Sequence, residues 1–511
     1  MKHGLLLFAL IIWTAGSTLT AQTAPHICGT HGDMAAPMIE RLHRNLETLQ
    51  NQPITPRDIQ YVPIKFHLVA KSDGTGRVAE SRMLDQLCAL NEDYLPLNVQ
   101  FYLKNGTFNN NINNTTVYNN HVGTINGIMS LSRDNSAMNV FVLDNVDNGD
   151  GLGVTLGYYS PGKDWIVVRR DQMGSTTRTL SHEVGHFLSL PHTFNGWDGE
   201  AYDPATHGTP APATSPGGVP TEKVDGSNCA TAGDFICDTP ADYNLGFGWN
   251  NCNYTGGALD PMGDLVDPEE RLFMSYFLQC LRTESFFSPT QQALMLADLA
   301  SAQRNYITPS YVPYQVEITE TPELLAPING EVTSGYNWVN FQWNGVGGAT
   351  KYLLEIDATP QLTSSGVTRL VVSGTNKIVT NLQANKTYYW RVRPYNEFRT
   401  CAGFTAISSF KTGTVTVDAE EIKFVENWSV QPNPVSVGQQ IGISVNSSKT
   451  FESSVSVLNA VGQVIYRKEN VQMTAGENQF QIPALSLARG MYFIALETSD
   501  AVLTKRIVVG D

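Results

Sequence analysis

The sequence reads HEVGHFLSLPH over residues 182–192, and this stretch decides how the rest of the chain is interpreted. His182 and His186 are four residues apart, so on a helix their side chains lie on one face and can reach one metal ion. Glu183 lies beside the first histidine. His192 comes too late for the same face, so we expect the helix to end and the chain to turn back before it. Three neutral imidazoles and one open position are typical of a catalytic zinc site.

Length and composition indicate an exported protein with several domains. At 511 residues, about three domains are expected. Charged residues make up 16% of the chain, and Asn, Thr, Ser and Gly take their place, which favours an extracellular, β-rich protein. The net charge is −15 at pH 7 and there is no basic patch, which argues against nucleic acid as a partner.

The amino-terminal end has the pattern of a secretory signal peptide over residues 1–21. A lysine and a histidine precede an apolar run from Leu5 to Trp13, and small and polar residues follow. This run is too short for a transmembrane helix, and we expect no transmembrane segment later in the chain. Residues 22–56 are polar and helix-prone, and we interpret them as a pro-segment with Arg57 as a processing point.

The pattern of apolar residues predicts an α/β domain with a mixed sheet and an active-site helix over residues 57–307. A last helix is expected to begin at Ser288, because Ser288-Pro289-Thr290-Gln291 forms a capping box. The other expected elements are strands at 62–69, 99–104, 137–143 and 165–169, an edge strand within 151–159, and a helix at 83–94.

Residues 195–238 have no regular period and are expected to be mostly loop. Disulfides or bound cations would be needed to hold such a loop. Asp225, Asp234 and Asp238 are candidate calcium ligands, with solvated turn aspartates as an equally weighted alternative.

Export permits disulfide bonds, and the chain has seven cysteines. Cys88 borders the apolar stripe of the helix at 83–94, and we interpret it as a buried free thiol. Cys28 and Cys401 are left over. Two bridges are expected among four clustered cysteines, but three pairings are possible and the sequence does not choose among them: Cys229, Cys237, Cys252 and Cys280.

Two all-β sandwich modules are predicted after a linker at residues 308–323. Short alternating strands such as Val339-Asn340-Phe341-Gln342-Trp343 indicate a β-sandwich. The first module resembles a fibronectin type III module over residues 324–413, and we interpret it as a spacer. A second linker follows at 414–425.

The second module, residues 426–511, resembles the C-terminal sorting domain of type IX secretion cargo. The resemblance is carried by PNPV at 432–435, a turn at Gly462, GMYF at 490–493 and KRIVV at 505–509. It implies recognition by the type IX machinery, passage across an outer membrane, and release or surface attachment. The alternative is an ordinary carbohydrate-binding or adhesive sandwich.

Residues 182–192 also match the zinc signature of the metzincin metalloproteases, His-Glu-x-x-His-x-x-Gly-x-x-His. The resemblance implies hydrolysis of peptide bonds in proteins by a zinc-activated water, with Glu183 as the general base. A Met-x-Tyr motif follows at Met274-Ser275-Tyr276. By the same resemblance Met274 forms a hydrophobic floor, the methionine turn, and Tyr276 stabilises the developing oxyanion.

Further downstream, GDFICDTP at 233–240 and FSPTQ at 287–291 make the chain similar to pappalysin-like metzincins over residues 57–305. Members of that family bind calcium in the loop region and have two disulfides there, usually pairing the first cysteine with the third and the second with the fourth. The resemblance also assigns Cys28 to a latency switch, in which its thiolate occupies the fourth zinc position until the pro-segment is removed.

The chain departs from the family in two places. Ser189 stands where the signature has glycine, and if that position needs a positive φ, serine costs about 1 kcal/mol. Members that prefer a basic residue after the cleaved bond carry acids just beyond Met-x-Tyr, whereas Phe277-Leu278-Gln279 has none. We therefore expect no strong preference for arginine or lysine.

We therefore expect from the sequence that the chain is a latent, secreted zinc endopeptidase. A non-catalytic surface adhesin on a decayed scaffold is the main alternative, and the intact Glu183 and Tyr276 argue against it. A zinc amidase acting on cell wall would not need the Met-x-Tyr or the latency cysteine.

Overall fold

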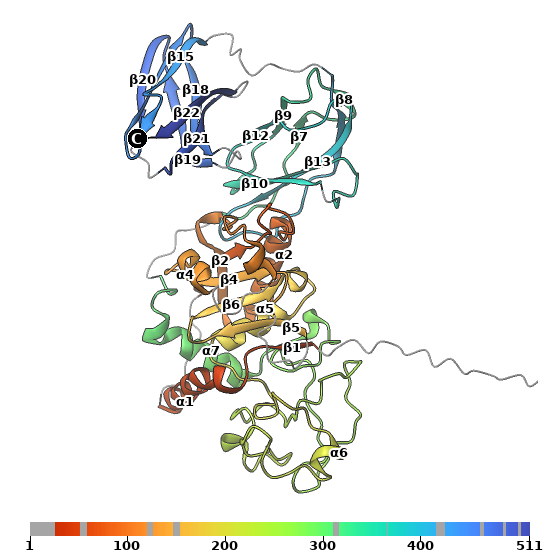
Figure 1. Ribbon diagram of the computed structural model, residues 1–511. Helices are drawn as coiled ribbons and strands as arrows, with labels where there is room; N and C mark the ends of the chain where they lie inside the picture. Colours follow the sequence, from red (N-terminus) through yellow and green to blue (C-terminus); the bar gives the residue numbers. More distant parts are fainter. Residues whose placement is uncertain are drawn as a thin grey trace, which may run out of the picture. The chain divides into compact units, whose positions relative to one another are not determined.

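The computed structural model in Figure 1 describes residues 26–51, 59–119, 126–146, 154–309, 316–364, 366–414, 425–459, 464–483, 487–498 and 502–510. The expected signal peptide, Arg57, the expected turn at Gly462, residues 310–315 of the first linker and residues 415–424 of the second lie outside these residues. Within them, no helix combines the length and apolar character needed to cross a membrane. The chain forms two compact units. The first comprises residues 1–78, 89–101 and 108–310, and the second comprises residues 79–88, 102–107 and 311–511.

The sheet of the first unit is six-stranded and mixed, with the order β1-β5-β6-β4-β2-β3. β5 runs antiparallel to β6, whereas the pairs β1–β5, β2–β4 and β4–β6 are parallel. The predicted strands from β2 onward lie close to their observed positions. The strands are β1 (His26–Cys28), β2 (Gln60–Leu68), β3 (Val99–Leu103), β4 (Met138–Leu143), β5 (Val154–Ser160) and β6 (Trp165–Arg169).

Strand β5 was expected at the edge of the sheet, but it has a neighbour on each side. β6 pairs with one side, and β1 from the amino-terminal segment pairs with the other. Without β1, β5 would present unpaired backbone groups. The prediction was therefore wrong because it did not include a strand contributed by residues 26–28.

The helices place the active-site stretch against the sheet. α5 packs on β5 and β6, and α1 lies beside α7 (Figure 1). The capping box at the start of α7 is confirmed, with Ser288 and Gln291 bonded reciprocally. The α-helices are α1 (Ala36–Asn51), α2 (Glu80–Asp93), α3 (Thr115–Asn119), α4 (Asn126–Ser132), α5 (Thr179–Phe187), α6 (Pro204–His207) and α7 (Pro289–Ala300).

The long loop after α5 has an aromatic core of its own, which includes Phe194, Trp197, Tyr243 and Phe277. Two disulfides add to it, Cys229–Cys237 and Cys252–Cys280. The pairing that the family resemblance implied, first with third and second with fourth, is therefore wrong. Each observed bridge joins cysteines that are consecutive along the chain, so each closes a short loop.

The second unit contains a sandwich built from sheets ordered β11-β10-β13-β14-β8 and β12-β9-β7. The alternation predicted for Val339, Phe341 and Trp343 is confirmed, because all three are buried in its core. Its strands are β7 (Leu324–Ala326), β8 (Glu331–Val332), β9 (Val339–Trp343), β10 (Lys351–Asp357), β11 (Thr368–Val372), β12 (Asn376–Val379), β13 (Thr387–Tyr395) and β14 (Ser408–Lys411).

A second sandwich has sheets ordered β15-β17-β20 and β16-β22-β21-β18-β19, with an aliphatic core between them. Its strands are β15 (Val425–Gln431), β16 (Val435–Ser436), β17 (Ile441–Ser447), β18 (Phe451–Asn459), β19 (Val464–Met473), β20 (Gly476–Ile482), β21 (Gly490–Glu497) and β22 (Val502–Gly510).

Cys88 is not a free thiol, because it forms a disulfide with Cys401 inside the second unit. Around this bridge, Arg393 Nη1 lies 2.6 Å from Asp85 Oδ1. Sequence reasoning missed the pair because 313 residues separate the two cysteines. The first sandwich is therefore covalently attached to the part of α2 that belongs to the second unit, and its role as a spacer stays a prediction.

Candidate metal centre and active site

Helix α5 carries the first two histidines and ends where the sequence required it to end. Its last helical residue is Phe187, and the N–H of Leu188 still donates to Val184 O at 2.9 Å. Ser189 then adopts φ 73°, the left-handed conformation that glycine adopts without strain. This turn reverses the chain and brings His192 back toward the helix.

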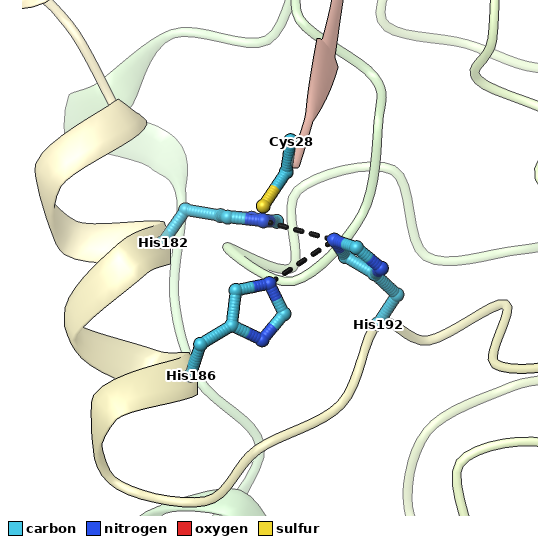
Figure 2. Close-up of side chains that lie close together, drawn as sticks. All are labelled: Cys28, His182, His186 and His192. Atoms are coloured by element: carbon cyan, nitrogen blue, oxygen red, sulfur yellow. Dashed lines mark hydrogen bonds between the residues drawn. The ribbon is translucent and has the colours of Figure 1, made fainter. Parts of the chain in front are cut away.

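The three histidines converge on one point (Figure 2). His192 Nε2 lies 3.2 Å from His182 Nε2 and 3.1 Å from His186 Nε2. All three side chains are buried. Burial, followed by the neighbouring imidazoles, lowers the pKa of His182 and His186 well below the usual value, so both rings are neutral.

The opposite nitrogen of each ring is held by an acceptor. His182 Nδ1 donates to Phe273 O at 2.6 Å, and His186 Nδ1 donates to Leu190 O at 2.7 Å. His192 Nδ1 lies 2.5 Å from Asp198 Oδ1. Because these oxygens can only accept, the protons sit on Nδ1 and each Nε2 presents a lone pair.

Three lone pairs that face one another at this separation repel unless a cation lies between them. The donor set therefore fits zinc, since neutral imidazole nitrogens are ligands that zinc prefers. The role of Asp198 was not predicted from the sequence, because an aspartate six residues after a histidine does not by itself indicate a hydrogen bond between them.

Cys28 belongs to the same group. Its Sγ and one nitrogen from each of the three histidines lie within 4.8 Å of one another (Figure 2). Among the described residues, these four side chains form a group that could hold a metal ion. Strand β1 delivers the thiol, and the N–H of Thr30 donates to Sγ at 3.3 Å. Burial and then Glu183 raise the pKa of the Cys28 thiol. A bound dication would favour the thiolate.

Glu183 is fully buried beside this group. Its Oε2 lies 3.5 Å from Cys28 Sγ, and its Oε1 has no hydrogen-bond partner. Burial raises the pKa of Glu183 to about 8, and the nearby Cys28 thiol and Tyr159 backbone lower that pKa only in part. A carboxyl group with this pKa can exchange protons near neutral pH.

Tyr276 and Met274 lie at the site as two parts of one turn. The N–H of Cys28 donates to Tyr276 Oη at 2.8 Å, and the Tyr276 ring centroid is 5.0 Å from that of His192. Met274 is fully buried under α5, where a side-chain carbon added at Gly185 would lie 2.5 Å from Met274 Sδ. Glycine at position 185 therefore allows the methionine to approach the helix closely.

Arg178, which sequence reasoning did not single out, holds this turn in place. It is buried at the start of α5, and its guanidinium donates to Phe277 O at 2.8 Å and to Leu272 O. No motif marked this arginine, because its partners are backbone carbonyls 94 and 99 residues away.

A cleft of about 780 Å³ opens beside the histidines. Cys28, Glu183 and Tyr276 line it, together with Thr176, Trp249 and Gln279. Glu183 is the only carboxylate among the described residues of the lining. The expectation of no strong preference for a basic residue stays a prediction.

The three candidate calcium ligands do not form one site among the described residues. Asp225 is exposed and accepts from the N–H of Ser227 at 2.9 Å. Asp238 is exposed and caps α7, accepting from the N–H of Thr290 at 2.8 Å. Both carboxylates therefore accept hydrogen bonds in a turn and at a helix start. This agrees with the alternative interpretation of them as solvated turn aspartates.

Asp234 lies among other acidic residues, the buried Glu222 and Asp242 and the exposed Asp238. Burial, then Asp234, then Asp242 raise the pKa of Glu222 to about 9. Glu222 Oε2 is buried without a hydrogen-bond partner. Glu222 and Asp242 were not predicted from the sequence, because their distances along the chain from Asp234 match no known motif.

The carboxyl-terminal module matches a known family. Residues 429–510 match the family described as the secretion system C-terminal sorting domain. This match covers most of the module that was expected at 426–511.

Several curated proteins named extracellular metalloprotease are similar to this chain. One from Colletotrichum graminicola is 27% identical over 248 residues, covering 46% of this chain and 74% of that protein. One from Verticillium alfalfae is 27% identical, covering 42% and 82%. Extracellular metalloprotease NCU07200 from Neurospora crassa is 30% identical, covering 31% and 60%.

Two solved structures were also found to be similar. The chicken CNTN1 FN1-FN3 domains have a TM-score of 0.16 and 12% identity, covering 39% of this chain and 69% of that chain. The Clostridium thermocellum CbhA fibronectin(III)-like modules have a TM-score of 0.15 and 11% identity, covering 37% and 93%.

Proposed function

We propose that this chain is a zinc-dependent endopeptidase of the pappalysin-like metzincin type, made as a latent precursor. The observation that carries the proposal is the convergence of three histidine Nε2 atoms whose Nδ1 atoms are all held by acceptors. His182, His186 and His192 would hold zinc. When bound, zinc supplies Lewis acidity, which makes water a usable nucleophile at neutral pH.

The remaining chemistry falls to two side chains of the cleft. Glu183 accepts the proton of the attacking water and passes it to the leaving amine. Tyr276 donates a hydrogen bond to the oxyanion that develops on the peptide carbonyl. Both side chains border the cleft in which a peptide would lie.

The contacts of Cys28 support the proposed latency. Its thiol belongs to the metal-ligand group and lies beside Glu183, and its backbone is bonded to Tyr276 Oη. A single residue of the amino-terminal segment would thus block the zinc, the base and the oxyanion donor together. Strand β1 also covers the edge of β5, which an extended peptide would otherwise reach.

The chain is secreted or attached to the cell surface. The sorting domain at 429–510 and the relatives named extracellular metalloproteases support this localisation. The same relatives support proteins as substrates, and the sorting domain supports type IX secretion machinery as a partner. We propose 57–307, 324–413 and 426–511 as the domain boundaries.

Calcium stays a proposal as well, with one ligand from the first set, Asp234, and one new ligand, Glu222. Glu222 and Asp234 are buried and Glu222 Oε2 lacks a partner, so a hard cation there would relieve an unfavourable environment. Asp225 and Asp238 are not part of this proposal.

The experiment that tests the function is digestion of casein by the processed protein, together with its zinc content. We expect one zinc per chain, and activity that a chelator abolishes and added zinc restores. His186→Ala should lose both the zinc and the activity. If the chain is instead a non-catalytic adhesin, the properly folded, zinc-loaded protein should not digest casein.

A further inference from the structure

Helix α1 inserts two polar side chains into the interior of the first unit. Arg41 and Asn45 lie one helical turn apart, and they are only 4% and 6% exposed. Burying polar side chains requires partners that compensate for lost water. Their partners form what we call the polar slot, made of the Tyr159 hydroxyl, the Phe187 carbonyl, the Ser189 hydroxyl and the Asp298 carboxylate.

The guanidinium of Arg41 donates two hydrogen bonds in the slot and forms an ion pair there, although its Nε has no hydrogen-bond partner. Nη1 donates to Tyr159 Oη at 2.9 Å, and Nη2 donates to Phe187 O at 3.2 Å. Nε lies 3.6 Å from Asp298 Oδ1. Phe187 is the last residue of α5, so its carbonyl lies at the negative end of the helix dipole, where a cation is favoured.

The carboxamide of Asn45 connects the two sides of the slot. Its Nδ2 donates to Ser189 Oγ at 2.8 Å and to Asp298 Oδ1 at 3.2 Å. On the other side of the carboxylate, Arg304 Nε donates to Asp298 Oδ2 at 2.8 Å. The slot therefore receives a guanidinium and a carboxamide at the i, i+4 spacing of one helix face.

Ser189 links the slot to the metal centre. It is the residue with φ 73° in the turn that leads from α5 to His192. Glycine would form this turn without strain, but only a residue with a side chain can supply the oxygen that Asn45 binds. The strained serine is thus explained by its contact with α1.

We propose that the polar slot is a second docking site for the amino-terminal segment, independent of Cys28, and that α1 stays bound there after the chain is cut between α1 and β2. The inference rests on the proposed function only in assuming that such a cut occurs. Cleavage alone would then not release the segment, and release of α1 from the slot becomes a separate step.

The test uses the full-length chain with Cys28→Ala, which removes the thiol anchor, and Glu183→Ala, which prevents self-digestion. A recognition sequence for a specific protease replaces residues 52–58. After the cut, gel filtration at physiological salt measures how much of the amino-terminal fragment co-elutes with the rest. We expect co-elution, and we expect Arg41→Met with Asn45→Leu to weaken retention by about tenfold or more.

The matched control changes the same two chemical groups on the exposed face of the same helix, Arg44→Met with Gln50→Leu. It should retain the fragment like the parent chain. Ser189→Gly tests the slot from the other side without threatening the fold, because glycine suits φ 73°, and it should also weaken retention. Circular dichroism before the cut verifies that each chain is folded.

The inference is overturned if the native fragment separates at once, or if the slot variants retain it as well as the control does. The chain under test is inactive by design, so the outcome does not depend on peptidase activity. A failure of the docking site can therefore be told apart from a failure of the proposed function.

Discussion

Cys28 Sγ lies 3.5 Å from Glu183 Oε2, and the same residue is bonded through its backbone to Tyr276. The proposed general base and the proposed oxyanion donor are therefore both engaged by one residue of the amino-terminal segment. A substrate and this segment cannot occupy the site together, which makes latency a property that single substitutions can test.

Cys28→Ala should convert the latent precursor into one that is active or processes itself early. The substitution removes the thiol that would compete for the zinc. The time course of self-processing on a denaturing gel measures this effect. Cys28→Ala with Glu183→Ala should remain unprocessed, and a Cys28→Ala precursor as latent as the wild type would argue against the switch.

Asp198→Asn should lower zinc affinity by roughly 10- to 100-fold, the usual effect of changing a residue that orients a metal-binding histidine. Asp198 Oδ1 lies 2.5 Å from His192 Nδ1, so it fixes the tautomer and orientation of that ring. Competition with a chelator measures the change. Asp267→Asn on the surface is the control, and equal zinc affinity for both variants would contradict the assigned role.

His67 should make the folded protein less stable as the pH falls. Burial lowers its pKa to about 4, and Asn109 Nδ2 donates to Nδ1 while Nε2 lies 2.9 Å from Asn139 Oδ1, so both nitrogens of the neutral ring are satisfied. The unfolded chain takes up this proton at about pH 6.5. The contribution of His67 to the free energy of unfolding is therefore complete above that pH. It is lost as the pH falls toward 4, by about 3 kcal/mol at most.

Denaturant unfolding at pH 7 and pH 4 checks this prediction for the wild type and for His67→Gln. The free energy of unfolding should fall less for the variant, because glutamine has no proton to gain. Identical pH dependence of the two proteins would show that His67 does not titrate in this way.

Calcium should raise the melting temperature of the wild type if Glu222 and Asp234 hold it. Binding to the folded state at a hundred times Kd adds about 2.7 kcal/mol of stability. Glu222→Gln should remove the response, whereas Asp225→Asn should keep it. A response that depends on Asp225 and not on Glu222 would restore the ligand set first drawn from the sequence.

The parts of the site that could be predicted from the sequence are those set by local spacing. His182 and His186 share a helix face whatever the rest of the chain does, and the signature placed His192 beside them. The capping box at Ser288 is equally local. Such features depend on a few consecutive backbone angles, so no knowledge of distant packing is needed.

What could not be predicted depends on contacts between distant segments. Cys88 meets Cys401 across 313 residues, and Asn45 meets Ser189 across 144. Neither pair has a spacing that a sequence pattern can mark. The strand at 26–28 was missed for the same reason, since only its parallel pairing with β5 makes it a strand.

The central claim, that Glu183 moves the proton in a zinc-dependent hydrolysis, is tested most directly by one rate. Peptide hydrolysis by processed wild-type protein is compared with that by processed Glu183→Gln, at equal bound zinc. We predict that the variant is slower by roughly a thousandfold, as expected for loss of a positioned general base. Equal rates for the two zinc-loaded proteins would contradict the account.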